Sequence, residues 1–271
     1  MQDLNIEVVR KATAVLECLS EDARGFSLHE IAHRLGLVKS STYRLLLTWE
    51  RLGYVEKEPS AGHYRLGIKT IELSRKVVGQ NRIAQYSRAM LTDLLKRFRE
   101  SVYLGIYRQQ RVVMVDMVES PQPVRVVVDL GQHCYLHASA LGRSVAAYLR
   151  EDSLNTILAR NGRPKLTPHT IVSRAKLREI LAGIRTRGYA VNREETVEGA
   201  VCTAAPFFAG EGGVLGALAI SIPVWRATGE LIAEVGNALR EAAAQLSRQL
   251  AGLSAEPDAL SRSFEREAAV S

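Results

Sequence analysis

The 271-residue sequence is poor in cysteine, which occurs only at positions 18, 134 and 202. These three cysteines form no Cys-x-x-Cys pair, the spacing on which zinc ribbons and redox motifs depend. An odd number of widely separated cysteines also argues against a disulfide framework, which is typical of oxidising compartments. We therefore expect no structural metal, no cofactor, and a reducing, cytoplasmic location.

Long apolar runs are also missing. The longest spans residues 214–225, and Gly216, Ser221 and Pro223 interrupt it. It is shorter than the roughly 20 apolar residues that a membrane-spanning helix needs. The first seven residues are acidic and contain no apolar core, so no secretory signal is visible. The sequence therefore predicts no association with a membrane.

Charge is abundant but does not identify a partner by itself. The chain has 36 Lys and Arg against 29 Asp and Glu, a net charge of +7, and 46% of its residues are hydrophobic. These are values of a globular protein. Residues 1–80 hold 12 basic and 10 acidic side chains, so most of the excess lies beyond them. Net charge favours a polyanionic partner, but only the local pattern can say where it binds.

Three short helices are predicted near the N-terminus. Apolar residues recur at helical spacing over residues 9–19. Ser27 and Glu30 form a capping box, in which each side chain bonds the other's backbone N–H, so a second helix begins there. It ends at the Gly36 turn. A third helix, residues 39–52, has an apolar face that is expected to be buried and consists of Thr42, Leu45, Leu46, Trp49 and Leu52.

A hairpin and a linker complete this part of the chain. Residues 54–57 and 63–66 are two short strand-like runs separated by a Pro- and Gly-containing turn. Two helices joined by a Gly turn and followed by a hairpin are typical of a winged helix-turn-helix, here residues 1–66. Residues 67–81 are predicted to form a linker helix.

The remaining chain predicts an α+β domain over residues 82–252, with an antiparallel or mixed sheet. A disordered tail, residues 253–271, is expected to follow because the sequence turns polar and loses its period. The predicted strands are 102–107, 112–118, 124–128, 201–208 and 214–222. The predicted helices are 82–98, 137–150, 154–160, 175–187 and 229–250.

One motif suggests a metalloenzyme but fits poorly. Residues 29–33 read His-Glu-Ile-Ala-His, the zinc-peptidase pattern H-E-x-x-H. The predicted helix is only about two turns long, Glu30 already serves as a cap, and no third ligand is evident. Two solvent-facing histidines are the simpler interpretation. Cys202 as a nucleophile lacks a histidine nearby in sequence, so we expect no enzyme.

The third helix begins with a polar turn that suits a DNA groove. Small hydroxyls and free N–H groups at a helix start bind phosphates or base edges, and Arg44, one turn on, can make a bidentate contact to guanine. The alternative is that Ser40 is only an N-cap and that the cations form a solvated face of the helix. This alternative explains Ser40 alone. The candidate DNA contacts are Ser27, Lys39, Ser40, Ser41, Thr42, Tyr43, Arg44, Arg51, His63 and Arg65.

Residues 5–250 resemble the IclR family of bacterial transcriptional regulators. The matching runs are residues 26–37, 39–46, 53–55, 64–67, 136–143, 187–190 and 202–206, together with Glu194, Glu195 and Gly199. The resemblance implies a winged helix-turn-helix, a linker helix and a GAF-like effector-binding domain. It also implies palindromic double-stranded DNA operators bound by a homodimer or a dimer of dimers, and a small-molecule effector, often an organic acid. Repression and activation both occur in the family.

The resemblance also places an effector pocket between the His137-containing segment and the Cys202 strand. The candidate effector contacts are Leu136, Ala140, Leu141, Asn192 on a loop, Cys202 and Ser221. Three departures from the family pattern, Tyr135, Asn192 and Ala219, favour an effector larger or less polar than a two- or three-carbon acid. The alternative is a C-terminal domain that serves only oligomerisation and leaves DNA binding independent of any ligand.

Overall fold

The computed structural model describes residues 6–209 and 213–253 and has the predicted α+β class. The predicted tail, residues 254–271, lies outside the described residues. The chain divides into two compact units, residues 1–80 and 81–271, and each is described here by itself.

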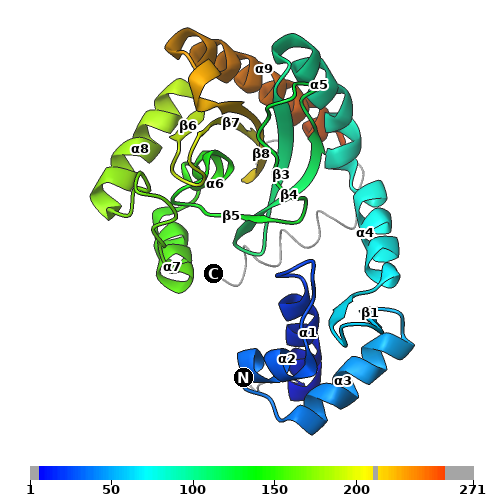
Figure 1. Ribbon diagram of the computed structural model, residues 1–271. Coiled ribbons are helices and arrows are strands. Elements are labelled where there is room, and N and C mark those ends of the chain that lie inside the picture. The colour runs from blue at the N-terminus through cyan, green and yellow to red at the C-terminus, as the bar shows by residue number, and fades with distance from the viewer. Residues whose placement is uncertain (1–5, 210–212, 254–271) are drawn as a thin grey trace. The chain divides into compact units, whose positions relative to one another are not determined.

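The N-terminal unit is a winged helix-turn-helix (Figure 1). Its elements are α1 (Glu7–Leu19), α2 (Leu28–Leu35), α3 (Lys39–Arg51), β1 (Val55–Lys57), β2 (Tyr64–Leu66) and α4 (Ile68–Gln80). Strands β1 and β2 pair antiparallel. Buried side chains of the three helices and the hairpin, among them Val15, Ile31, Leu46 and Tyr64, form one hydrophobic core.

The predicted capping box starts α2. The Ser27 hydroxyl accepts the Glu30 N–H at 3.3 Å, and the Glu30 carboxylate accepts the Ser27 N–H at 2.7 Å. Gly36 ends the helix in the left-handed region, at φ 62°, which glycine adopts at little cost. These local bonds set the turn between α2 and α3, and so they fix where α3 begins.

The C-terminal unit is built on an antiparallel sheet. Its strands are β3 (Ser101–Arg108), β4 (Arg111–Val118), β5 (His133–Cys134), β6 (Ala190–Arg193), β7 (Ala200–Phe208) and β8 (Val214–Pro223). Its helices are α5 (Arg82–Phe98), α6 (Ala140–Ala146), α7 (Glu151–Asn161), α8 (Arg174–Arg187), the short η1 (Val224–Arg226) and α9 (Gly229–Leu253). The strand order is β5-β4-β3-β8-β7-β6.

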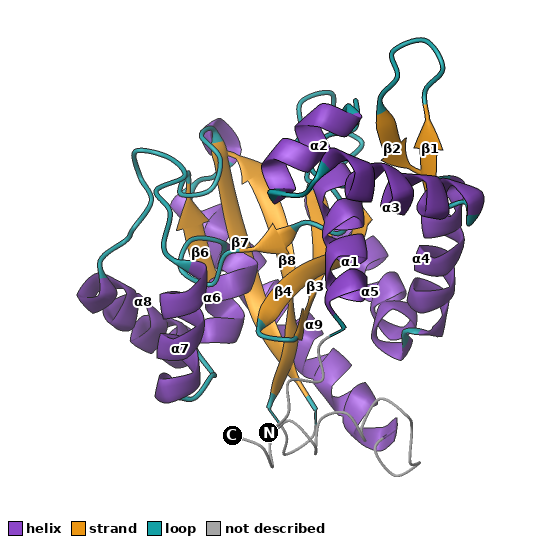
Figure 2. Ribbon diagram, turned by 90° about the horizontal axis from the view of Figure 1, so that it is seen from below, coloured by secondary structure: helices purple, strands orange, loops and turns teal. Residues whose placement is uncertain are grey.

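The sheet curls, with helices on both faces (Figures 1 and 2). Helices α5 and α9 pack on one face in a core that contains Leu91, Leu218 and Leu239. Helices α6, α7 and α8 cover the other face in a second core. Two covered faces explain why β8 is buried at every position and reads as one apolar run.

Helix α6 lies directly against neighbouring backbone. A Cβ at Gly142 would collide with the carbonyl of Tyr135, so only glycine permits this approach. The Ser144 hydroxyl also donates to the Ala204 carbonyl of β7 at 2.8 Å. These contacts hold α6 against the middle of the sheet.

Four predictions about local structure were wrong. Residues 124–128 form no strand; the Val126 carbonyl accepts the Tyr103 hydroxyl at 2.7 Å instead of a ladder bond. Strand β6 was missed, and it places Asn192 in a strand rather than a loop. The helix predicted over residues 137–150 is limited to α6. Leu52 is 55% exposed rather than buried, because it follows the last turn of α3.

One buried hydroxyl has no partner and yields a prediction. Thr203 on β7 is fully buried, and its Oγ1 makes no hydrogen bond within the described residues. Because an unsatisfied buried hydroxyl costs about 1–3 kcal/mol, Thr203→Val should raise the free energy of unfolding by about 1 kcal/mol. Chemical denaturation measures this change. A destabilised variant would mean that the hydroxyl is hydrogen-bonded in solution.

Candidate DNA-binding surface and effector pocket

The N-terminus of α3 has no side-chain cap. Its N-cap is Val38, which makes no capping bond, so Ser40 lies inside the first turn and does not cap it. Backbone N–H groups at an uncapped helix start attract phosphate oxygens. The first turn of α3 therefore keeps backbone N–H groups that no side chain caps, and anion binding there stays a prediction.

Most of the candidate contacts on α3 are accessible to solvent. Lys39, Ser40, Ser41, Tyr43, Arg44 and Arg51 are all exposed. Thr42 is the exception, because it is fully buried and its hydroxyl donates to the Val38 carbonyl at 3.2 Å. Thr42 is therefore a core residue, and its prediction as a DNA contact is corrected.

The remaining candidates lie at the N-cap of α2 and in the wing, and most already interact with other residues of the protein. The Ser27 hydroxyl accepts the Glu30 N–H but can still donate its own hydrogen. The Nε of Arg65 lies 3.8 Å from the Glu56 carboxylate, and His63 is half-buried. The wing therefore offers fewer unengaged cations than α3 does.

The H-E-x-x-H histidines lie one turn apart on α2. The ring centroids of His29 and His33 are 6.5 Å apart, and both side chains are exposed. Within residues 6–209 and 213–253, no group of three or more His, Cys, Asp or Glu side chains is arranged to hold a metal ion. The Glu30 carboxylate is bonded to the Ser27 N–H.

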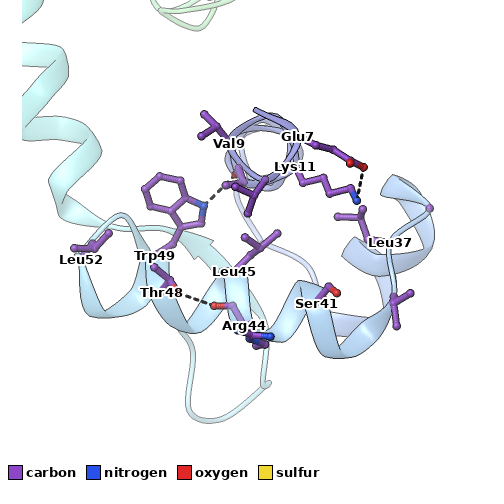
Figure 3. Close-up of a pocket in the computed structure, with 14 residues that line it drawn as sticks. Glu7, Val9, Lys11, Leu37, Ser41, Arg44, Leu45, Thr48, Trp49 and Leu52 are labelled. Carbon is purple, nitrogen blue, oxygen red and sulfur yellow. Dashed lines mark hydrogen bonds and ion pairs between the residues drawn. The ribbon is translucent and has the colours of Figure 1, made fainter. Parts of the chain in front are cut away.

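An apolar groove of about 730 Å³ lies between α1 and α3 (Figure 3). Val9 and Leu52 line it and are 57% and 55% exposed. Trp49 closes one end by donating from Nε1 to the Ala12 carbonyl at 3.0 Å. Ser41 and Arg44 lie along its α3 side. Sequence reasoning missed this groove, although the adjacent pair Val8 and Val9 is an available signal.

A second cavity, of about 230 Å³, lies in the C-terminal unit and is the candidate effector pocket. Five of the six predicted contacts line it, namely Ala140, Leu141, Asn192, Cys202 and Ser221. Leu136 is the exception, since it lines a different cavity beside α7. The pocket also contains Tyr103, Met114, Cys134 and Thr196, which sequence reasoning did not identify.

Asn192 shapes the pocket but has little left to offer a ligand. Its Nδ2 donates to the Ala138 carbonyl at 2.7 Å and to the Thr196 hydroxyl at 3.1 Å, and its Oδ1 accepts the Glu195 N–H. Both amide hydrogens are therefore used within the protein. Asn192 joins the segment before α6 to the β6–β7 turn, so its role is to position the wall.

The pocket disfavours negative charge on its own side chains. Cys202 on β7 faces Ser221 on β8 as a direct cross-strand pair. Burial raises the pKa of Cys202 to about 11, and burial likewise raises the pKa of Cys134 and of Tyr103 to about 12. A thiol that stays protonated at neutral pH is a poor nucleophile, which argues against covalent catalysis by Cys202.

Two domains known from other proteins match the chain, one after the other along the sequence. Residues 8–59 match the IclR helix-turn-helix domain, and residues 75–248 match the domain described as Bacterial transcriptional regulator IclR C-terminal. This chain belongs to the IclR family of transcriptional regulators. It therefore has an N-terminal helix-turn-helix for DNA and a C-terminal domain for a small-molecule effector, as the sequence predicted.

Relatives match this IclR-family chain over nearly their whole length. The HTH-type transcriptional regulator XynR of Escherichia coli is 33% identical, with 90% of this chain and 97% of that protein covered. The Glycerol operon regulatory protein of Streptomyces griseus is 32% identical, at 91% and 97% coverage. A solved IclR regulator from Alicyclobacillus acidocaldarius superimposes with a TM-score of 0.81, 30% identity, and coverage of 91% and 99%.

The named relatives are regulators rather than enzymes. No helix within residues 6–209 and 213–253 is long and apolar enough to cross a membrane.

Proposed function

We propose that this chain acts in the cytoplasm as a transcriptional regulator whose α3 helix enters the major groove of a palindromic operator. The observation that carries this is the exposed, uncapped start of α3 with Arg44 one turn on. In this proposal residues 1–66 bind DNA, residues 67–81 link the domains, and residues 82–252 take up the effector. The proposed contacts are Ser27, Lys39, Ser40, Ser41, Tyr43, Arg44, Arg51, His63 and Arg65.

The protein is proposed to bind as a homodimer or a dimer of dimers. A palindromic site presents two half-sites about one helical turn apart, which two symmetric copies match. The apolar α1–α3 groove supports self-association because it leaves Val9 and Leu52 exposed beside α3. Exposed apolar patches of this kind are typical of protein interfaces.

The proposed effector is a small organic acid with one carboxylate and an apolar body. Among the described residues, no Lys or Arg lines the candidate pocket, so a multiply charged acid would lack compensation there. A cavity of about 230 Å³ has room for such a molecule, since a water takes about 30 Å³. An open cavity also favours an effector over the alternative in which the C-terminal domain serves only assembly.

The test combines operator mapping with ligand titration. Genome-wide mapping of bound sites identifies the operator, and calorimetry of the full chain with a panel of organic acids identifies the effector. The larger side chain in Ser221→Val narrows the pocket and should weaken effector binding at least tenfold. Thr203→Val, on the opposite face of the neighbouring strand, is the control. If no acid of the panel binds the full chain saturably, the assembly-only alternative is correct.

A further inference from the structure

A third cavity, separate from the effector pocket, lies on the outer side of the C-terminal unit. It is a cleft of about 550 Å³ between α8, β6 and the segment around residues 169–171. Figure 1 shows α8 and β6 side by side. Four cations, Arg143, Lys176, Arg187 and Arg193, line it together with two carboxylates, Glu179 and Glu195. The cleft therefore has two more positive than negative charges.

Both carboxylates are already paired with two of the cations. The Glu195 carboxylate accepts hydrogen bonds from Arg143 Nη1 and Nη2 at 2.5 Å each, and both side chains are almost completely buried. The Glu179 carboxylate lies 2.8 Å from Lys176 Nζ on the surface of α8. What remains is Arg187 and Arg193, which are exposed and have no ion-pair partner in the described part of the chain. The positive excess is thus held by two guanidinium groups.

Local structure holds one of these guanidinium groups at the cleft. Arg187 Nε donates to the Tyr189 carbonyl at 2.6 Å, and its Cζ lies 5.5 Å from the Tyr189 ring centroid. One turn earlier on α8, Gly183 leaves the space beside Arg187 unfilled; the nearest atom to a Cβ there would be Nη1, at 3.8 Å. Glycine in a helix interior is destabilising relative to alanine. At position 183, the absence of a side chain leaves the cleft open beside Arg187.

The cleft and the effector pocket have opposite electrostatic character. The part of the chain that the structure describes contributes no Lys or Arg to the effector pocket, and burial raises the pKa of the pocket's thiols. The cleft has an excess of guanidinium groups, which bind carboxylate and phosphate oxygens in bidentate geometry. The same domain therefore offers one cavity that suits a weakly charged ligand and another that suits a strongly charged one.

We propose that the α8–β6 cleft is a second ligand site, which binds a small anion with two or more negative charges through Arg187 and Arg193. The Arg143–Glu195 pair forms its floor. Phosphorylated metabolites and polycarboxylates share this chemistry, so pyrophosphate and citrate serve as separate probes. The probe that binds more tightly shows whether the site prefers phosphate or carboxylate groups.

Calorimetric titration of the full chain with each probe tests the site. Saturable binding of at least one probe is expected, weakening as salt is added because the guanidinium groups are exposed. Arg187→Gln and Arg193→Gln should each reduce the affinity about tenfold, since each removes a charge-assisted contact. Both side chains are exposed, so the melting temperature should stay close to that of the native chain.

Three control variants assign the binding to the cleft. Arg174→Gln removes an exposed cation at the other end of α8 and should leave the affinity unchanged. Unchanged affinity in Arg44→Ala would exclude binding at the DNA surface, and unchanged affinity in Ser221→Val would exclude binding in the effector pocket. If neither probe binds saturably, or if Arg187→Gln and Arg193→Gln bind as tightly as the native chain, the cleft is not an anion site.

Discussion

Replacing Arg143 with alanine is expected to lower the free energy of unfolding of the C-terminal unit by about 3–5 kcal/mol, because breaking a buried ion pair leaves one charge uncompensated. The Arg143 side chain is 1% exposed, and its Nε also donates to the His137 carbonyl at 2.8 Å. Its partner Glu195 accepts the Ile171 N–H as well. Alanine would leave the Glu195 carboxylate buried without its cation.

The Arg143→Ala substitution should also affect the candidate effector pocket. The Glu195 N–H bonds Asn192, and the Thr170 hydroxyl bonds the Glu195 carbonyl at 2.6 Å. Asn192 in turn bonds the segment before α6 through Ala138. Arg143→Ala should therefore also weaken effector binding, although Arg143 does not line that pocket.

Calorimetric unfolding measures the effect on stability. For a unit of this size, 1 kcal/mol shifts the melting temperature by about 2–4 °C, so a decrease on the order of 10 °C is expected. The double variant Arg143→Met/Glu195→Leu removes both charges and should recover much of the loss. Arg178→Ala is the matched control, since it breaks an exposed pair with Glu151 that is worth at most about 1 kcal/mol. An equal shift in Arg143→Ala and Arg178→Ala would contradict the prediction.

Replacing Arg44 with alanine is expected to weaken operator binding by about 1–3 kcal/mol, or about 5- to 150-fold. Arg44 is exposed on α3 one turn after its uncapped start. It makes no ion pair with any residue that the structure describes. Its guanidinium group is therefore available to contact guanine in the major groove. Fluorescence anisotropy on a mapped operator at fixed salt measures the change.

Base contact and phosphate contact give different outcomes in this experiment. Arg44→Ala should relax the preference at one base position in each half-site. Arg51→Ala, at the end of the same helix, should weaken binding to all sequences equally and reduce the salt dependence. Arg24→Ala is the control, because Arg24 is paired with Asp22 between α1 and α2. Unchanged affinity in Arg44→Ala would remove Arg44 from the interface.

Short-range signals explain why the N-terminal elements could be predicted. The capping box joins residues three apart, and the turn at Gly36 closes within the same segment. Such bonds depend on neighbours in the sequence, so the residues that form them are visible there. The major strands β3, β4, β7 and β8 were also predicted, because a long apolar run indicates a buried strand whichever strand it pairs with.

The errors lie where distant segments meet. Residues 124–128 have strand-forming side chains, but the Tyr103 hydroxyl bonds their backbone instead of a neighbouring strand. Strand β6 has only four residues and depends on pairing with β7. Thr42 was expected both on the buried face of α3 and as a DNA contact, and its complete burial rules out the second role. Long-range pairing of this kind leaves little local trace.

The sequence alone was enough to predict a helix-turn-helix whose second helix begins at Lys39, and to place Cys202 and Ser221 on neighbouring strands. Tertiary structure decided which of these side chains remain available. It ruled out a DNA contact for Thr42, used both amide hydrogens of Asn192 within the protein, and placed Leu136 beside another cavity. It also brought Arg143, Lys176, Arg187 and Arg193 to one cleft beside α8 and β6. The physical reason is that a hydrogen bond or ion pair joins groups close in space, and the fold alone brings those groups together.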